Sequence, residues 1–269
     1  MSENDKTVTE NPSSSFPVMR RVKASAIIDW LHAGVEDTRR GGLASLFYGV
    51  FFAATGLLLH AVFAENYWLL AGLTTGFLLL GPFLAMGLYD LSRRMELGEP
   101  PKLVPSLTAW RPNLINIGLF AGLLVVVLLA WTRTSFVIFA HFFDGRLPTF
   151  TDVVLNVITF KQPSFTLIYF AVGGLFATFI FAITVIAMPL MMDRKTNAIA
   201  AALASLLACS RNPVPLLLWA FCIVVLIGFG FATSFLGLIV TMPVVGHATW
   251  HVYRDVVETN SHQHKTTWQ

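Results

Sequence analysis

The chain reads VPLLLWAFCIVVLIGFGFATSFLGLIVTMPVVGHATWHVY from Val214 to Tyr253, about forty residues without an Asp, Glu, Lys or Arg. A helix needs about 20 apolar residues to cross the 30 Å hydrocarbon core of a bilayer. The stretch is therefore too long for one membrane span and long enough for two. Small and polar residues from Gly228 to Ser234 indicate a turn, so we expect an antiparallel pair near 214–231 and 234–253.

The composition of the whole chain agrees with this reading. Of 269 residues, 55% are hydrophobic and 12% are charged, and the mean hydropathy is +0.68. A soluble domain carries about 25% charged residues. The composition excludes a large soluble domain and predicts that the protein contacts the lipid bilayer. The net charge of +3 is modest, and no basic stripe interleaved with aromatic residues indicates nucleic-acid binding.

Four further apolar stretches precede this pair, near 43–63, 67–89, 113–131 and 165–188. Together they predict an all-α membrane bundle of about six transmembrane helices in three hairpins. Between the third and fourth spans, two apolar pieces are each too short to cross a bilayer. We expect these pieces, which lie within residues 132–162, to be interfacial segments or an extension of the third helix.

The remaining segments are polar or amphipathic. Residues 1–20 have the composition of a disordered tail, and residues 22–40 carry apolar side chains at helical spacing, which predicts an amphipathic helix at the membrane interface. A short surface helix is predicted at 198–209. We therefore expect one membrane domain over 21–257 and a C-terminal tail over 258–269.

The basic residues predict the orientation. With six spans and an internal N-terminus, 15 of the 18 Lys and Arg residues lie inside, and only Arg133, Arg146 and Lys161 lie outside. Cytoplasmic loops carry the excess of Lys and Arg. We therefore expect both termini in the cytoplasm.

The returning helix of each predicted hairpin has a proline near its cytoplasmic end: Pro82, Pro189 and Pro243. These prolines are candidate helix kinks. Their recurrence indicates a duplicated hairpin, a pattern found in transporters. Proline is also common in ordinary transmembrane helices, so the pattern alone does not decide between the two explanations.

Three stretches resemble a known family. They are LGPFLAMGLYDLSRRMELGEPP (80–101), MPLMMDRKTNAIAAALASLLACSRNP (188–213) and PVVGHATWHVYRDVV (243–257). They look like a domain-of-unknown-function family of proteobacterial integral membrane proteins, with the resemblance extending over about residues 25–258. The resemblance implies a polytopic protein of the bacterial inner membrane. It assigns no activity, cofactor or site.

His247 and His251 form the first candidate site. They are four residues apart on one helical face, a spacing that could ligate a metal or haem. A b-type haem normally needs a histidine from a second helix, and the sequence offers no obvious partner. Trp250, Tyr253 and Arg254 surround the pair, which is the composition of an interfacial belt. We therefore favour interfacial histidines, predict no cofactor, and keep a ligand or proton-relay pair as the alternative.

Two acidic residues, Asp193 and Asp90, lie near predicted span ends. An ionisable residue inside a span is a functional candidate by default. Here Asp193 precedes Arg194-Lys195, and Asp90 lies just before Arg93-Arg94, so the simpler interpretation is an ion pair at the interface.

No hydrolase, metalloprotease, P-loop or dinucleotide-binding motif is present, and we expect a protein that is not an enzyme. The sequence favours a non-enzymatic accessory or assembly component of a membrane complex that contacts other membrane subunits. The alternatives are a small-solute transporter or channel built from repeated hairpins, and a haem- or metal-binding redox subunit that uses the histidine pair.

Overall fold

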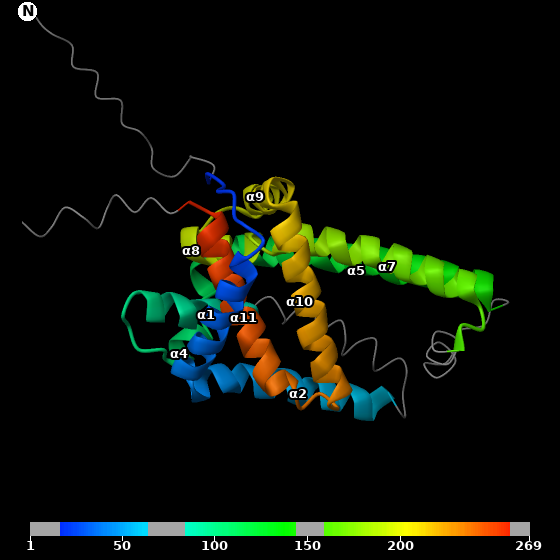
Figure 1. Cartoon of the computed structure of the whole chain (residues 1–269), viewed down its shortest axis with the longest axis horizontal. Coiled ribbons are helices and arrows are strands. Elements are labelled where there is room, and N and C mark those ends of the chain that lie inside the picture. The colour runs from blue at the N-terminus through cyan, green and yellow to red at the C-terminus, as the bar shows by residue number, and fades with distance from the viewer. Residues whose placement is uncertain (1–16, 64–83, 144–158, 259–269) are drawn as a thin grey trace, which may run out of the picture.

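The computed structural model describes residues 17–63, 84–143 and 159–258, and these residues fold almost entirely into helices (Figure 1). Within the described residues the only strand-like pairing is an isolated antiparallel bridge between Met19 and Val257. The predicted all-helical class is therefore confirmed.

The amphipathic helix and the first apolar stretch form a bent pair. Helix α1 (Ala26–Gly41) and helix α2 (Leu43–Phe63) meet at an angle of 104°. Gly42 lies between them with φ +50°, a left-handed conformation that glycine adopts without steric cost. The sharp turn lets α1 fold back over the bundle, whereas the sequence predicted an amphipathic helix at the membrane interface.

The central part of the chain ends in one long helix. A helix covers residues 84–96, and α4 (Leu103–Ser106) and the 3₁₀ turn η1 (Arg111–Asn113) lead into α5 (Leu114–Phe142). Of the two predictions for the apolar residues after 131, the extension of the third helix is confirmed up to Phe142. Most of the second apolar piece lies outside the described residues, as does most of the predicted span at 67–89.

The predicted fourth span is interrupted near its end. Helix α7 (Pro163–Thr184) stops before α8 (Ala187–Arg194) begins. Pro189 has no amide hydrogen, and its ring would clash with the carbonyl of Val185 four residues earlier. The break falls at that residue, so Pro189 ends the helix as a kink-forming proline should. The short helix predicted next is confirmed as α9 (Ala198–Arg211).

The last apolar stretch folds as two helices, as its length predicted. They are α10 (Pro213–Ala232) and α11 (Leu238–Val256). Pro243 lies inside α11 without ending it, and Pro82 lies outside the described residues. Ser234 and Phe235 have φ values of 53° and 68°, which places the tight turn slightly later than the glycines indicated.

The two ends of the described chain lie side by side. The Arg20 amide donates to the Val256 carbonyl at 2.7 Å, and the Glu258 amide donates to the Val18 carbonyl at 2.9 Å. Residues 18–20, which the composition assigned to the N-terminal tail, therefore pair with the end of α11. The two ends of the described chain are therefore in direct contact.

Three helical segments of the described chain are long and apolar enough to cross a bilayer, or four if the bent α1–α2 pair counts as one broken span. The three are Leu103–Phe142, Pro163–Arg194 and Pro213–Ala232. Helix α11 is not among them, since polar side chains such as His247 and Thr249 lower its hydropathy. The described residues therefore show several helices that are apolar enough to cross a bilayer.

The helices fall into two groups. Helix α11 is enclosed by α1, α2 and α10, whereas α5 and α7 run together as a long pair (Figure 1). The main core contains Trp30, Trp219 and Trp250, all almost fully buried. This core holds α1 and α11 together and creates the setting of the polar site.

Candidate functional site

The centre of α11 holds a histidine with no exposed surface. His247 is fully buried, and both of its ring nitrogens have partners. Nε2 lies 2.8 Å from the hydroxyl of Ser45 in α2, and Nδ1 lies 2.7 Å from the hydroxyl of Ser92 in the helix over 84–96. One ring thus joins three helices that are far apart in sequence.

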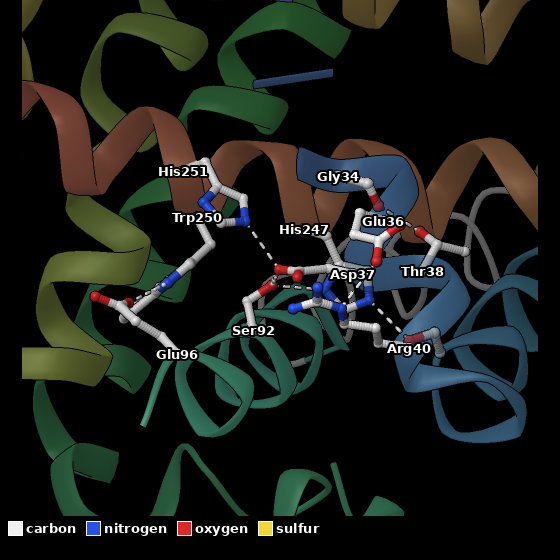
Figure 2. A network of polar contacts seen from close by, with 11 residues as sticks. Gly34, Glu36, Asp37, Thr38, Arg40, Ser92, Glu96, His247, Trp250 and His251 are labelled. Atoms are coloured by element: carbon white, nitrogen blue, oxygen red, sulfur yellow. Dashed lines mark hydrogen bonds and ion pairs between the residues drawn. The ribbon is translucent and has the colours of Figure 1, made fainter. Parts of the chain in front are cut away.

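Asp37 of α1 connects this histidine to the second one. Its Oδ2 accepts a hydrogen bond from Ser92 at 2.7 Å and lies 2.8 Å from Nε2 of His251 (Figure 2). The His251 side chain is 29% exposed. A continuous chain of hydrogen bonds therefore runs from a partly exposed ring to the fully buried hydroxyl of Ser45.

The positions of the hydrogens follow from the number that each group can donate. Ser92 has one hydroxyl hydrogen and donates it to Asp37. Nδ1 of His247 must then donate to Ser92. Because burial disfavours the charged imidazole, Nε2 carries no hydrogen and accepts from Ser45. The network thereby fixes a single tautomer of His247.

Asp37 stays ionised at neutral pH. Burial acts to raise its pKa, but hydrogen bonds from His251 and Ser92, with the nearby His251 and His247 rings, lower the pKa below its ordinary value. A carboxyl group with a lowered folded-state pKa adds stability that is present above the unfolded pKa and is lost as the pH falls through the folded one. The network is therefore intact at neutral pH and weakened by strong acid.

Close helix contacts bring these groups together. A Cβ atom at Gly34 of α1 would lie 2.7 Å from the Val244 carbonyl oxygen, and one at Gly49 of α2 would overlap the Ile239 carbonyl. Pro243 has no amide hydrogen to donate to Ile239. Its presence in α11 therefore leaves that carbonyl free to face the Gly49 backbone, and only a glycine allows this approach.

A second polar group borders the network on the side of His251. The indole of Trp250 donates to Glu96 at 3.1 Å (Figure 2). Arg254 forms an ion pair with the same carboxylate. The Arg254 guanidinium also lies 5.9 Å from the centre of the Trp250 ring, within range of a cation–π interaction. These contacts join the end of α11 to the helix over 84–96.

The structure also places the other predicted site residues. Asp193 accepts a 2.6 Å hydrogen bond from the hydroxyl of Tyr253, and not from the neighbouring basic residues that the sequence indicated. Asp90 is buried and pairs with Arg94 at 2.6 Å, as its position suggested. Neither carboxylate belongs to the His247 network: Asp193 joins α8 to α11, whereas the Asp90–Arg94 pair lies within the helix over 84–96.

The predicted role of the histidines needs revision on one point. The sequence favoured interfacial histidines, but His247 lies inside the protein because α1 covers this face of α11. A metal bound to His247 would have to replace one of its two serine bonds. No group of three or more His, Cys, Asp or Glu able to hold a metal occurs within the described ranges. The ligand pair stays a prediction.

The arrangement resembles a nucleophile and its base in one respect, since Ser45 donates to the unprotonated nitrogen of His247. Ser45, however, has no exposed surface, so the pair as folded does not face a substrate. The hydrogen-bonded network joins four helices and sets the position of each hydrogen between them.

Sequence reasoning missed three members of the network: Asp37, Ser45 and Ser92. Asp37 lies within the amphipathic helix predicted at 22–40 but was not singled out, and single serines carry no spacing signal. The helical spacing that places Asp37 on the same face as Trp30 and Gly34 is visible in the sequence. The structure shows that this face of α1 is buried.

The fold and the site are those of a helical integral membrane protein with several apolar helices and a buried polar centre. Residues 69–193 match the family described as "Predicted integral membrane protein (DUF2189)", which confirms over these residues the expected resemblance to a domain-of-unknown-function family of integral membrane proteins. The match includes the stretch at 80–101 and ends at Asp193, so most of the other two stretches lie beyond it. No curated protein and no solved structure matches the chain.

Proposed function

We propose that this protein is a non-enzymatic accessory or assembly component of a larger membrane complex. The observation that carries the proposal is an open pair of glycines on α5. A Cβ atom placed on Gly118 or Gly122 would meet no atom of the described residues within 4 Å. The two glycines are one helical turn apart, and apolar residues around them are exposed, including Ile115 at 79% and Leu119 at 63%.

Lipid and a partner helix place different demands on such a face. Lipid tails solvate leucine as well as glycine, so a lipid-facing helix gains nothing from losing its side chains. A partner helix does gain, since small residues four apart let two backbones approach closely. An exposed glycine pair on an apolar helix therefore favours a protein partner within the bilayer.

The proposal includes a topology. It has six spans, both termini in the cytoplasm, and insertion in the bacterial inner membrane. The bridge between Met19 and Val257 supports an even number of spans. The fifteen basic residues on one side against three on the other support a cytoplasmic location of the ends. Helix α11 serves as the sixth span, and its polar residues avoid lipid because α1, α2 and α10 surround it.

The experiment is a native-size measurement at natural expression level. Membranes from cells carrying a chromosomally tagged copy are extracted in mild detergent and separated on a native gel, with cross-linking before extraction. We expect a band well above the size of the 29.7 kDa monomer in its micelle. A single monomeric band with and without cross-linking would contradict the proposal.

Two variants locate the contact. Gly118→Leu fills the open face of α5 and should release the monomer from the complex. Gly228→Leu is the matched control: it makes the same change on an open face of α10, where the residue one turn earlier is the large Val224. It should leave the complex intact, and equal loss in both variants would point to general damage.

The second candidate is a small-solute transporter or channel. It is favoured by the break between α7 and α8 at Val185, because discontinuous helices form many transporter sites. Solute uptake by vesicles containing only this purified protein would favour the transporter over the accessory role. Vesicles that stay impermeable to ions and small solutes would remove the transporter.

A further inference from the structure

A basic cluster lies where the chain enters α1 and α10. It consists of Arg20, Arg21, Lys23 and Arg211, all exposed. None of the ion pairs among the described residues includes any of the four. Among the described residues, the guanidinium groups of Arg20 and Arg211 donate only to backbone carbonyls, and no described carboxylate forms an ion pair with the cluster.

Two of the nearby acidic side chains are already engaged. Asp255 accepts a 2.7 Å hydrogen bond from the indole of Trp30, and Glu96 is paired with Arg254. Glu258 is exposed at the same end of the chain. Its backbone carbonyl accepts from Arg194, and its carboxylate is in none of the ion pairs among the described residues. The cluster proper still contains four cations and no carboxylate.

The cluster is built by one buried side chain and is not a chance gathering of mobile arginines. Asn212 accepts a hydrogen bond from the Val22 amide and donates one to the Arg20 carbonyl, both at 2.9 Å. It is 2% exposed. These two bonds hold the segment that carries Arg20, Arg21 and Lys23 against the start of α10. The chain enters α1 and α10 from the same end (Figure 1).

An apolar pocket lies further along the same two helices. It has a volume of about 200 Å³ and is partly open. Its lining residues are Leu31 of α1 and Phe221, Cys222, Val225 and Leu226 of α10. No polar side chain lines it, so its natural content is hydrocarbon.

The separation of the cluster and the pocket corresponds to the depth of one leaflet. Phe221 and Leu226 lie eight and thirteen residues after Pro213, which at 1.5 Å per residue is about 12 to 20 Å along α10. Half of a bilayer with its headgroup region is about 20 Å thick. A lipid whose phosphate lies at the cluster would therefore place its acyl chain at the pocket.

We infer that the crevice between α1 and α10 is a binding site for an anionic phospholipid. The basic cluster holds the phosphate-containing headgroup, and the pocket beside Cys222 takes part of an acyl chain. The negative headgroup complements the unpaired cations, while a zwitterionic lipid would bring its own positive charge into the cluster. This site is separate from the glycine face of α5 and does not rest on the proposed function.

Cys222 gives a direct reporter of the pocket. The full-length protein with Cys209→Ser is purified in detergent, and alkylation of Cys222 by N-ethylmaleimide is followed by mass spectrometry. Cys209 is removed for clarity, although burial raises the pKa of its thiol to about 11 and already slows its reaction. Phosphatidylglycerol is then titrated in, with phosphatidylcholine of the same chain length in parallel.

We expect phosphatidylglycerol to slow the alkylation several-fold and phosphatidylcholine to have little effect at equal concentration. Replacing Arg20 and Arg211 by Gln should weaken the protection by phosphatidylglycerol about thirtyfold, because each basic residue near an anionic surface is worth about 1 kcal/mol. Arg133→Gln removes an exposed charge at the far end of α5 and should leave the protection unchanged.

Three outcomes would overturn the site. The first is equal protection by the two lipids, and the second is full protection in the Arg20 and Arg211 variant. The third is equal protection by inorganic phosphate, which would show an anion site without an acyl chain. The native-gel experiment above reads the oligomeric size, so a failure of either proposal is distinguishable from a failure of the other.

Discussion

Helix α11 and the α5–α7 pair are both apolar in sequence, but they are held in place by different means. Around α11, four helices share a buried hydrogen-bonded network, and glycines bring their backbones into contact. Between α5 and α7, aromatic rings do the packing: the Phe139 and Tyr169 rings stack at 5.3 Å, and the Trp131 and Phe176 rings lie 5.4 Å apart.

The difference follows from the surroundings of each helix. Helix α11 is covered by protein on most sides, so its polar groups can find partners that lipid does not offer. Helices α5 and α7 are exposed on their outer faces, where only apolar side chains are tolerated. Their contact therefore relies on packing and ring geometry, which is adaptable, whereas the contacts of α11 depend on single atoms.

The largest expected effect tests the backbone contact of α11. Gly49→Ala introduces a methyl group that overlaps the Ile239 carbonyl, and we expect it to lower the free energy of unfolding by about 3 kcal/mol, the upper end of the range for overpacking. The measurement is unfolding by dodecyl sulfate in mixed micelles. Gly118→Ala on α5, where a Cβ meets no described atom, is the matched control and should change stability very little. Similar losses in both variants would remove the contrast between the two regions.

The next effect tests the polar network. Ser92→Ala leaves Asp37 and Nδ1 of His247 without their shared partner, and an unsatisfied buried polar group costs about 1 to 3 kcal/mol. We expect a lower melting temperature and faster hydrogen exchange at the end of α1. Ser210→Ala is the control, since Ser210 is exposed and bonds only within its own helix. A neutral Ser92→Ala would mean that the network contributes no net stability.

A smaller effect is expected in the aromatic seam. Phe139→Leu keeps an apolar side chain but removes contacts with the Phe165 and Tyr169 rings, and aromatic pairs contribute about 0.5 to 1.5 kcal/mol beyond burial. The same unfolding titration applies. Phe179→Leu, on an exposed part of α7, should be close to neutral. A loss at Phe139 as large as that at Gly49 would show that the seam is as specific as the core of α11.

The smallest expected effect on stability comes from an exposed charge on α1, which can be compared with the buried charge of Asp37. Glu36 and Arg40 form an exposed i,i+4 ion pair on α1, one residue from the buried Asp37. Glu36→Gln should cost only about 0.3 to 0.5 kcal/mol, and the difference should vanish in high salt because exposed charges are screened. Asp37→Asn, measured beside it, should cost more and keep its effect in salt. Equal and salt-sensitive losses would place Asp37 among ordinary surface charges.

Some of the site could be predicted from the sequence and some could not. The spacing of His247 and His251 on one face of a helix was visible, because helical periodicity is local. The carboxylate that links them was not, since Asp37, which bonds His251 directly and reaches His247 through Ser92, lies more than two hundred residues away. Ser45 and Ser92 are small polar residues next to apolar runs, and nothing in their neighbourhood distinguishes them from serines that bond their own helix.

What the sequence by itself determined is the medium and the elements: long apolar stretches require lipid, and they form helices because only internal backbone hydrogen bonds satisfy a chain in hydrocarbon. The breaks at Gly42 and at Pro189 also follow from local chemistry. Only the tertiary structure decided that α1 folds over α11, that the two chain ends pair, and that His247 is enclosed between two serines. These outcomes depend on contacts between distant residues, where the close approach of two backbones decides which polar groups meet.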